Sequence, residues 1–141
     1  HGITVGLGTD GTSSNNNLDM LEECRLAAML HKNMTGDPEI IPAAQALAMA
    51  TSEGAKALSF NDVGKIEAGQ KADIVLYNMN KPYWHPRNDR TSLFVYAANA
   101  NDADTVLVNG KVLMQNGELL YIDLEKVYAE ADARARRLTN K

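Results

Sequence analysis

The chain has 141 residues, a net charge of −4 and a single cysteine, Cys24. A content of 45% hydrophobic and 23% charged residues is typical of a globular domain with a buried core, and it argues against a disordered chain or a membrane-spanning one. The acidic balance supplies no basic surface for nucleic acid, and a lone cysteine can form no internal disulfide, so we expect a reducing, cytoplasmic location.

The first predicted element is a buried strand over residues 3–7, a β-branched apolar run between two glycines. It leads to Asp10 and then to a polar loop, Gly11–Asn17. In α/β enzymes, catalytic residues often lie at the C-terminal ends of strands and in the loops that follow them. A functional role for Asp10 is therefore favoured. A turn-forming role is the alternative. A helix-capping role is less favoured, because an asparagine of the loop already stands at the N-cap position.

The position of this strand in the chain is unusual. The sequence starts at His1 without a methionine and enters a core-type strand within two residues. We expect the chain to be the C-terminal piece of a longer protein.

Helices are predicted next. Residues 18–32 place Leu21, Cys24, Ala28 and His31 at helical spacing. Pro42 suits the first turn of a second helix over 43–50, and a further turn or helix covers 52–58. The many small residues imply close packing, and Gly54 in particular indicates close approach of a neighbouring segment.

Short strands are predicted after residue 60. Residues 63–77 suggest a short strand, a glycine turn and a buried strand, and residues 78–89 form a loop. Residues 92–98 are compatible with a strand or a short helix. Asn109-Gly110 predicts a hairpin between 105–108 and 111–114, and Asn116-Gly117 leads into 118–122.

The last predicted helix covers residues 124–138. It has an apolar stripe and two i, i+4 pairs, Glu130 with Arg134 and Asp132 with Arg136. The predicted type of structure therefore changes near Phe60. An α/β unit precedes this residue, and a small sandwich or barrel with a closing helix follows it.

Four motifs together resemble the amidohydrolase superfamily, and within it the methylthioadenosine/S-adenosylhomocysteine deaminases and related chlorohydrolases. The motifs are Gly8-Thr9-Asp10-Gly11 with Ser14-Asn15-Asn16, Ala50-Thr51 with Gly54-Ala55, Gly64–Gly69 with Lys71–Val75, and, more loosely, Val108–Lys111. The resemblance implies that residues 1–59 hold the last strand and C-terminal helices of a metal-dependent (β/α)₈ barrel. Residues 60–141 would be a β-sandwich segment with a C-terminal helix.

The resemblance also implies a site. Asp10 would bind zinc, or iron in some members, and would take a proton from the attacking water, while Ser14 and Asn15 would contact substrate. The family also uses histidine ligands and a catalytic glutamate. His1, His31 and His85 do not match the histidine ligands, and the glutamate cannot be placed in this sequence either. We therefore expect the isolated chain to be inactive.

The function that the resemblance implies is hydrolysis of a carbon–nitrogen bond in a purine nucleoside or a related ring amine. Dechlorination of a triazine is one alternative, and a non-catalytic assembly module with a vestigial site is another. We expect a small-molecule substrate and a homo-oligomer, and no nucleic acid or membrane partner. For other candidates a structural role is favoured: a turn role for Asp73, partial burial for His31, and packing for Cys24 and for the loop around His85.

Overall fold

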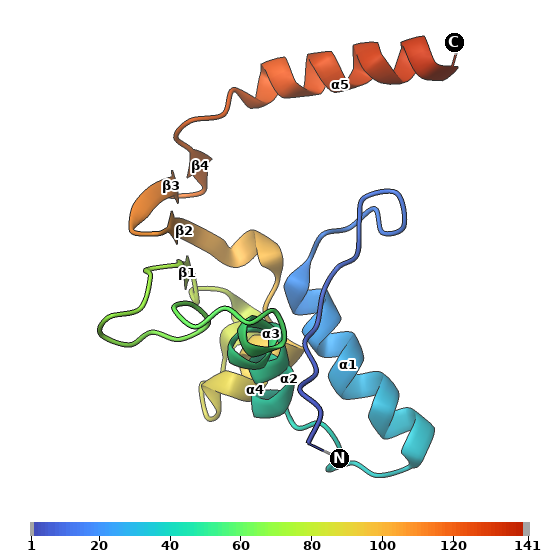
Figure 1. The fold of residues 1–141 in the computed structure, drawn as a ribbon, viewed down its shortest axis with the longest axis vertical. Coiled ribbons are helices and arrows are strands. Elements are labelled where there is room, and N and C mark those ends of the chain that lie inside the picture. Colours follow the sequence, from blue (N-terminus) through green and yellow to red (C-terminus); the bar gives the residue numbers. More distant parts are fainter. Residues whose placement is uncertain (1, 140–141) are drawn as a thin grey trace.

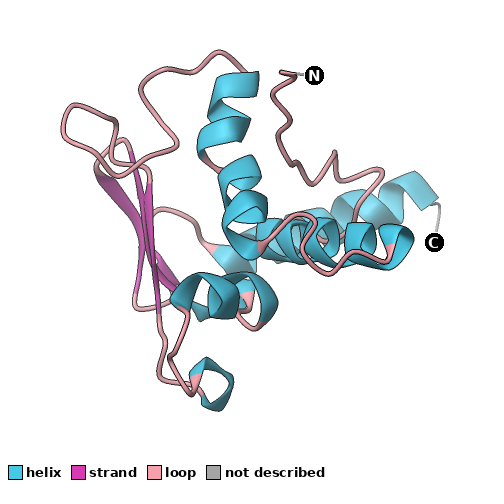
Figure 2. Cartoon of the chain, turned by 90° about the horizontal axis from the view of Figure 1, so that it is seen from below, coloured by secondary structure: helices cyan, strands magenta, loops and turns pink. Residues whose placement is uncertain are grey.

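The computed structural model describes residues 2–139, which fold into a group of helices with an antiparallel sheet on one side (Figures 1 and 2). This mixed helix-and-sheet composition agrees with the predicted α/β class. The elements, in chain order, are α1 (Met20–Thr35), α2 (Ala43–Ala50), α3 (Ser52–Ala57), β1 (Ile74–Tyr77), η1 (Pro82–Trp84), α4 (Arg90–Tyr96), η2 (Ala100–Asp102), β2 (Ala103–Val108), β3 (Lys111–Gln115), β4 (Glu118–Leu119) and α5 (Leu124–Thr139).

Helix α1 begins and ends with specific caps. The side chain of Asp19 accepts hydrogen bonds from the backbone N–H groups of Leu21 and Glu22, so Asp19 is the N-cap. The prediction of an asparagine of the preceding loop at this position is wrong. Gly36 ends the helix in the left-handed conformation, with φ of 70°. The helix is therefore three residues longer at its C-terminus than predicted.

The first core cluster lies where α1, α2 and α4 meet. Its fully buried members are Cys24 and Ala28 of α1, Ala46 of α2 and Val95 of α4. Three of these four side chains are small, which lets the helix backbones approach closely. Arg25 joins two of the helices: its guanidinium, on α1, donates to the carbonyl oxygens of Val95 (3.2 Å) and Ala98 (2.5 Å) at the end of α4. The small residues thus have the packing role that the sequence predicted.

The second core cluster surrounds Trp84, which is only 1% exposed and packs with Leu21 and Ala98. Its indole N–H donates to the carboxylate of Asp102 at 3.1 Å. The same carboxylate accepts from the Tyr83 hydroxyl at 2.6 Å and from the backbone N–H of Asn99 at 3.0 Å. The loop around Trp84 is therefore a packing element, as predicted.

The sheet has the strand order β1-β2-β3-β4, and every neighbouring pair is antiparallel. Asn109 and Gly110 both have positive φ, 48° and 77°, and make the predicted hairpin between β2 and β3. Asn116 and Gly117 (52° and 78°) make the next turn. For residues 92–98 the sequence left strand and helix open; residues 92–96 lie in helix α4 (Arg90–Tyr96), which has Asp89 as its N-cap.

Several predicted elements differ in the structure. Residues 3–7 form no strand, because no neighbouring strand pairs with them among the described residues, and Ile3 is 78% exposed. Residues 63–66 form no strand either, and β1 is half-buried instead of buried. Helix α5 forms as predicted and extends away from the rest of the described chain, with its whole apolar stripe exposed (Figure 1).

One of the two ion pairs predicted on α5 is present. Glu130 pairs with Arg134 at 3.2 Å, whereas the predicted pair of Asp132 with Arg136 is absent from the described ion pairs. Within residues 2–139, every helix is too short or too polar to cross a bilayer.

Candidate functional site

On the N-terminal side of Asp10, a backbone hydrogen bond attaches the segment to the helices. The backbone N–H of Leu7 donates to the carbonyl oxygen of Met49, at the end of α2, at 3.0 Å. Beside this bond Gly6 lies against Gly54 so closely that a Cβ added to Gly6 would be 2.9 Å from the Gly54 Cα. The close approach that the sequence predicted at Gly54 therefore exists, and it sets where residues 6–8 run.

Asp10 itself is exposed and has a φ of 59°, in the left-handed region. Its Oδ1 accepts from the backbone N–H of Gly11 at 2.6 Å. Aspartate adopts this conformation more readily than most residues, but strained backbone of this kind also gathers at functional sites. The geometry presents the carboxylate to solvent, with Oδ2 free of any described hydrogen bond.

The loop after Asp10 contains Ser14 and Asn15. The N–H groups of both residues donate to the carbonyl of Gly11 at 2.9 Å. The Ser14 side chain is exposed, while that of Asn15 is half-buried and donates from Nδ2 to Glu23 Oε1 of α1 at 3.0 Å. Asp10, Ser14 and Asn15 thus lie on one short loop, but they have not been brought together by an interaction among their side chains.

The described residues do not form a metal centre by themselves. They contain no group of three or more histidine, cysteine, aspartate or glutamate side chains placed to hold a metal ion. A catalytic zinc needs three protein ligands, and Asp10 offers one.

An open groove of about 1080 Å³ does not have Asp10 among its lining residues. Its walls come from Gly6–Gly8, the α2–α3 region, residues 57–66 and β1, and they are predominantly apolar. The one carboxylate among its lining residues, Asp73, is already committed to a backbone N–H. The groove has the chemistry of a packing surface and lacks that of a hydrolytic site.

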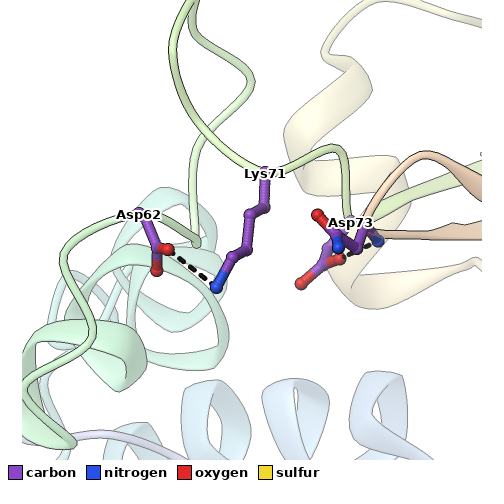
Figure 3. Close-up of polar contacts among 4 residues, drawn as sticks. Asp62, Lys71 and Asp73 are labelled. Atoms are coloured by element: carbon purple, nitrogen blue, oxygen red, sulfur yellow. Dashed lines mark hydrogen bonds and ion pairs between the residues drawn. The ribbon is translucent and has the colours of Figure 1, made fainter.

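Figure 3 shows Asp73 beside a second polar contact, between Asp62 and Lys71. Asp73 Oδ1 accepts from the backbone N–H of Asn109 at 2.6 Å and so stabilises the β2–β3 turn. Lys71 Nζ lies 2.7 Å from Asp62 Oδ2; this bond lowers the pKa of Asp62 and raises that of Lys71. Asp73 thus has a backbone-capping role, as expected, although the turn that it caps is in the neighbouring hairpin.

The histidine and cysteine candidates are also structural or solvated. His31 is exposed, which corrects the predicted partial burial: the helical stripe turns out of the core after Ala28. His85 is exposed beside Arg87, and its neighbour Trp84 supplies the packing. Cys24 is buried, and burial raises the pKa of its thiol.

The amidohydrolase family model matches residues 1–113, which include Asp10, helices α1–α4, strands β1 and β2 and the start of β3. The chain belongs to the amidohydrolase family. This match confirms the resemblance carried by the glycine-rich and aspartate-containing motifs.

Individual amidohydrolases match nearly the whole chain. A 5-methylthioadenosine/S-adenosylhomocysteine deaminase of Pelotomaculum thermopropionicum is 52% identical over 140 residues, which cover 99% of this chain and 32% of that protein. The solved structure of a zinc-bound adenosine deaminase from Xanthomonas campestris superposes with a TM-score of 0.94 at 35% identity, covering 99% of this chain and 32% of that one. The zinc complex of an atrazine chlorohydrolase from Arthrobacter aurescens TC1 gives a TM-score of 0.85 at 33% identity, covering 94% and 30%. The chain thus spans about a third of the length of these relatives.

Two features of the candidate site were missed at the sequence level. One is the cap at Asp19, which the spacing Asp19-x-x-Glu22 could have indicated, since an acid three residues after a capping residue is typical of a helix start. The other is the pairing of loop asparagines with glutamates of α1. Nothing in the sequence spacing of Asn15 and Glu23 indicates that contact.

Proposed function

We propose that this chain serves as the C-terminal part of a metal-dependent amidohydrolase that hydrolytically deaminates a purine nucleoside. In that reaction water adds to the ring carbon that carries the amino group, and ammonia leaves. The observation that carries the proposal is the 52% identity, over nearly the whole chain, to a 5-methylthioadenosine/S-adenosylhomocysteine deaminase. Methylthioadenosine and S-adenosylhomocysteine are accordingly the substrates to test first.

The proposed architecture follows the predicted division of the chain. Residues 1–59 would contribute the last strand and C-terminal helices of a (β/α)₈ barrel, and residues 60–141 a β-sandwich segment with its closing helix. Residues 3–7 would form a strand only beside neighbouring barrel strands, because a strand needs hydrogen-bonded neighbours. The high structural similarity to an adenosine deaminase supports this arrangement.

Asp10 is the proposed catalytic residue and metal ligand, and Ser14 and Asn15 are the proposed substrate contacts. An exposed carboxylate without a cationic partner can serve either role: it supplies negative charge to a cation and accepts a proton from the attacking water. We propose zinc as the metal because the adenosine deaminase and the atrazine chlorohydrolase are zinc complexes, with iron as the alternative. When bound, the metal would lower the pKa of water, and its further ligands would lie outside the described residues.

Dechlorination of a triazine ring is the second candidate, and the similarity to an atrazine chlorohydrolase favours it. Both reactions replace a ring substituent by oxygen from water, so Asp10 would serve them in the same way. The higher identity to a deaminase, 52% against 33% for the atrazine chlorohydrolase, supports deamination as the first candidate.

The test is a substrate panel on the intact zinc-loaded protein. Ammonia release from methylthioadenosine or S-adenosylhomocysteine, without chloride release from atrazine, is the expected result. Asp10→Asn should remove the activity. Asp73→Asn, which keeps an acceptor oxygen for the Asn109 N–H, is the matched control and should retain activity. Chloride release alone would favour the second candidate, and no turnover would favour a non-catalytic module.

A further inference from the structure

The loop that carries the candidate substrate contacts has no hydrophobic anchor. Residues 11–17 read Gly-Thr-Ser-Ser-Asn-Asn-Asn, so no side chain of the loop can be held by apolar burial. Its internal bonds to the Gly11 carbonyl shape the loop, but they do not tie it to the rest of the fold. Side-chain contacts to α1 must therefore set its position.

Two amide–carboxylate contacts supply that connection. Asn15 donates to Glu23, and Asn17 donates to Glu22, in both cases through the side-chain amide. They differ in environment: Asn15 and Glu23 are half-buried, whereas Asn17 and Glu22 are exposed. Because water competes less at the half-buried contact, we expect the bond of Glu23 to hold the loop more firmly.

The contact to Glu23 also fixes which way the Asn15 amide points. A carboxylate can only accept, so the NH₂ end of the amide must face Glu23. The carbonyl end accepts from the backbone N–H of Asn17 at 3.0 Å, which agrees with that orientation. One N–H and one lone pair of the Asn15 side chain remain for a ligand, in a defined direction.

We propose that Glu23 is a positioning residue: it acts on substrate binding through Asn15 without touching the substrate. The role in turnover rests on the proposed function, whereas the effect on the orientation of Asn15 does not. Glu23 is anchored for this purpose by α1, whose Leu21, Cys24, Ala27 and Ala28 are buried in the core. The helix thus transmits the rigidity of the core to a loop that has no core residue of its own.

The test combines kinetics of the intact protein with an amide spectrum. Glu23→Ala should raise KM about tenfold with kcat changed less than about twofold, the pattern of lost ground-state binding. Glu23→Gln keeps an acceptor oxygen and should recover most of the loss. Glu22→Ala, the matched control on the exposed contact, should change KM less than about twofold, as expected of an exposed hydrogen bond. In an Asn15→Ala background, Glu23→Ala should add no further increase in KM.

The NMR signals of the Asn15 side-chain NH₂ give a readout that does not depend on turnover. In the 141-residue chain they should be dispersed and exchange slowly, and Glu23→Ala should collapse them to free-amide values while the signals of α1 beyond the neighbours of residue 23 stay unchanged. Signals that Glu23→Ala leaves unmoved would overturn the proposal, as would equal KM effects of Glu22→Ala and Glu23→Ala. If the intact protein turns over no substrate, the proposed function fails, and the spectrum still decides whether Glu23 orients Asn15.

Discussion

The helical core and the segment that carries Asp10 are stabilised by different forces. Helices α1, α2 and α4 bury Cys24, Ala28, Ala46 and Val95 almost completely. Residues 2–18, by contrast, contain no buried side chain, and Val5 is 53% exposed. Apolar burial therefore stabilises the scaffold, whereas the Asp10 segment depends on the bond from Leu7 to Met49 and on the amide contacts to α1.

This difference shows how stability and chemistry are divided along the chain. Substitutions in the core should change the free energy of unfolding, and substitutions in the Asp10 segment should change activity with little effect on folding.

Asp10→Asn should give the largest effect. We expect the kcat of the intact protein to fall at least about 1000-fold, a barrier increase of about 4 kcal/mol, because an amide can neither carry charge nor accept the proton. The melting temperature should be unchanged, since Asp10 is exposed and the amide oxygen can still accept from the Gly11 N–H. Retention of a tenth of the wild-type kcat would contradict the proposed role of Asp10.

Trp84→Ala should be the most damaging change to the core. Trp84 is 1% exposed, and truncation of a buried aromatic side chain to alanine costs about 3–5 kcal/mol in unfolding free energy. Denaturant unfolding measures the loss. Tyr128→Ala, at an aromatic residue of α5 that is 56% exposed, is the control and should change stability by less than about 0.5 kcal/mol. Equal losses for the two variants would show that the core is not where the structure places it.

Asp102→Ala should cost about 3 kcal/mol, because it removes three hydrogen bonds and leaves the buried Trp84 N–H without a partner. Burial raises the pKa of Asp102, but the bonds from Tyr83, Asn99 and Trp84 and the charge of Lys81 outweigh burial, so the pKa lies below its ordinary value of 3.8. The ionised carboxylate therefore stabilises the fold above about pH 4, and this contribution is lost as the pH falls through the lowered pKa.

The pH dependence provides the check on Asp102. The stability difference between wild type and Asp102→Ala should be constant from pH 7 to about pH 5 and should shrink below the ordinary pKa of 3.8. Urea unfolding at a series of pH values measures it. A difference that grows on acidification would mean that Asp102 is held protonated in the native state.

Asp73→Ala should have the smallest effect. It removes one acceptor for the Asn109 N–H in the β2–β3 turn, at a cost of about 1 kcal/mol, and should leave kcat unchanged. Asp73→Asn keeps the acceptor and should recover most of this stability. A large loss of activity in Asp73→Asn would instead make Asp73 a second catalytic acid, the role that its turn position disfavours.

Local patterns predicted the fold well wherever the interaction partners are close in sequence. Asn109-Gly110 specified its hairpin because both residues accept positive φ, and the small residues of α2 indicated close packing. The strand over residues 3–7 failed for the opposite reason. Its apolar pattern is typical of a strand that pairs with neighbouring strands, and no strand among the described residues pairs with it.

In the candidate site, the sequence motifs indicated individual residues but not the contacts between them. The family resemblance indicated Asp10, Ser14 and Asn15, which lie on one loop, and their roles stay a prediction. The contact of Asn15 with Glu23 needs the fold of the loop against α1, and the cluster at Asp102 joins Tyr83, Trp84 and Asn99 across up to 19 residues. Such contacts depend on tertiary structure and leave no periodic signal in the sequence.

Native-state hydrogen exchange of the 141-residue chain tests the contrast between core and Asp10 segment most directly. The amides of Ala28 and Val95 should exchange only through global unfolding, because they lie in buried helical turns. The amides of Val5 and Thr9 donate no backbone hydrogen bond in the described structure and should exchange almost as fast as in an unfolded peptide, with Leu7 intermediate. Protection of Val5 and Thr9 equal to that of Val95 would contradict the account, because the Asp10 segment would then be part of the cooperative core.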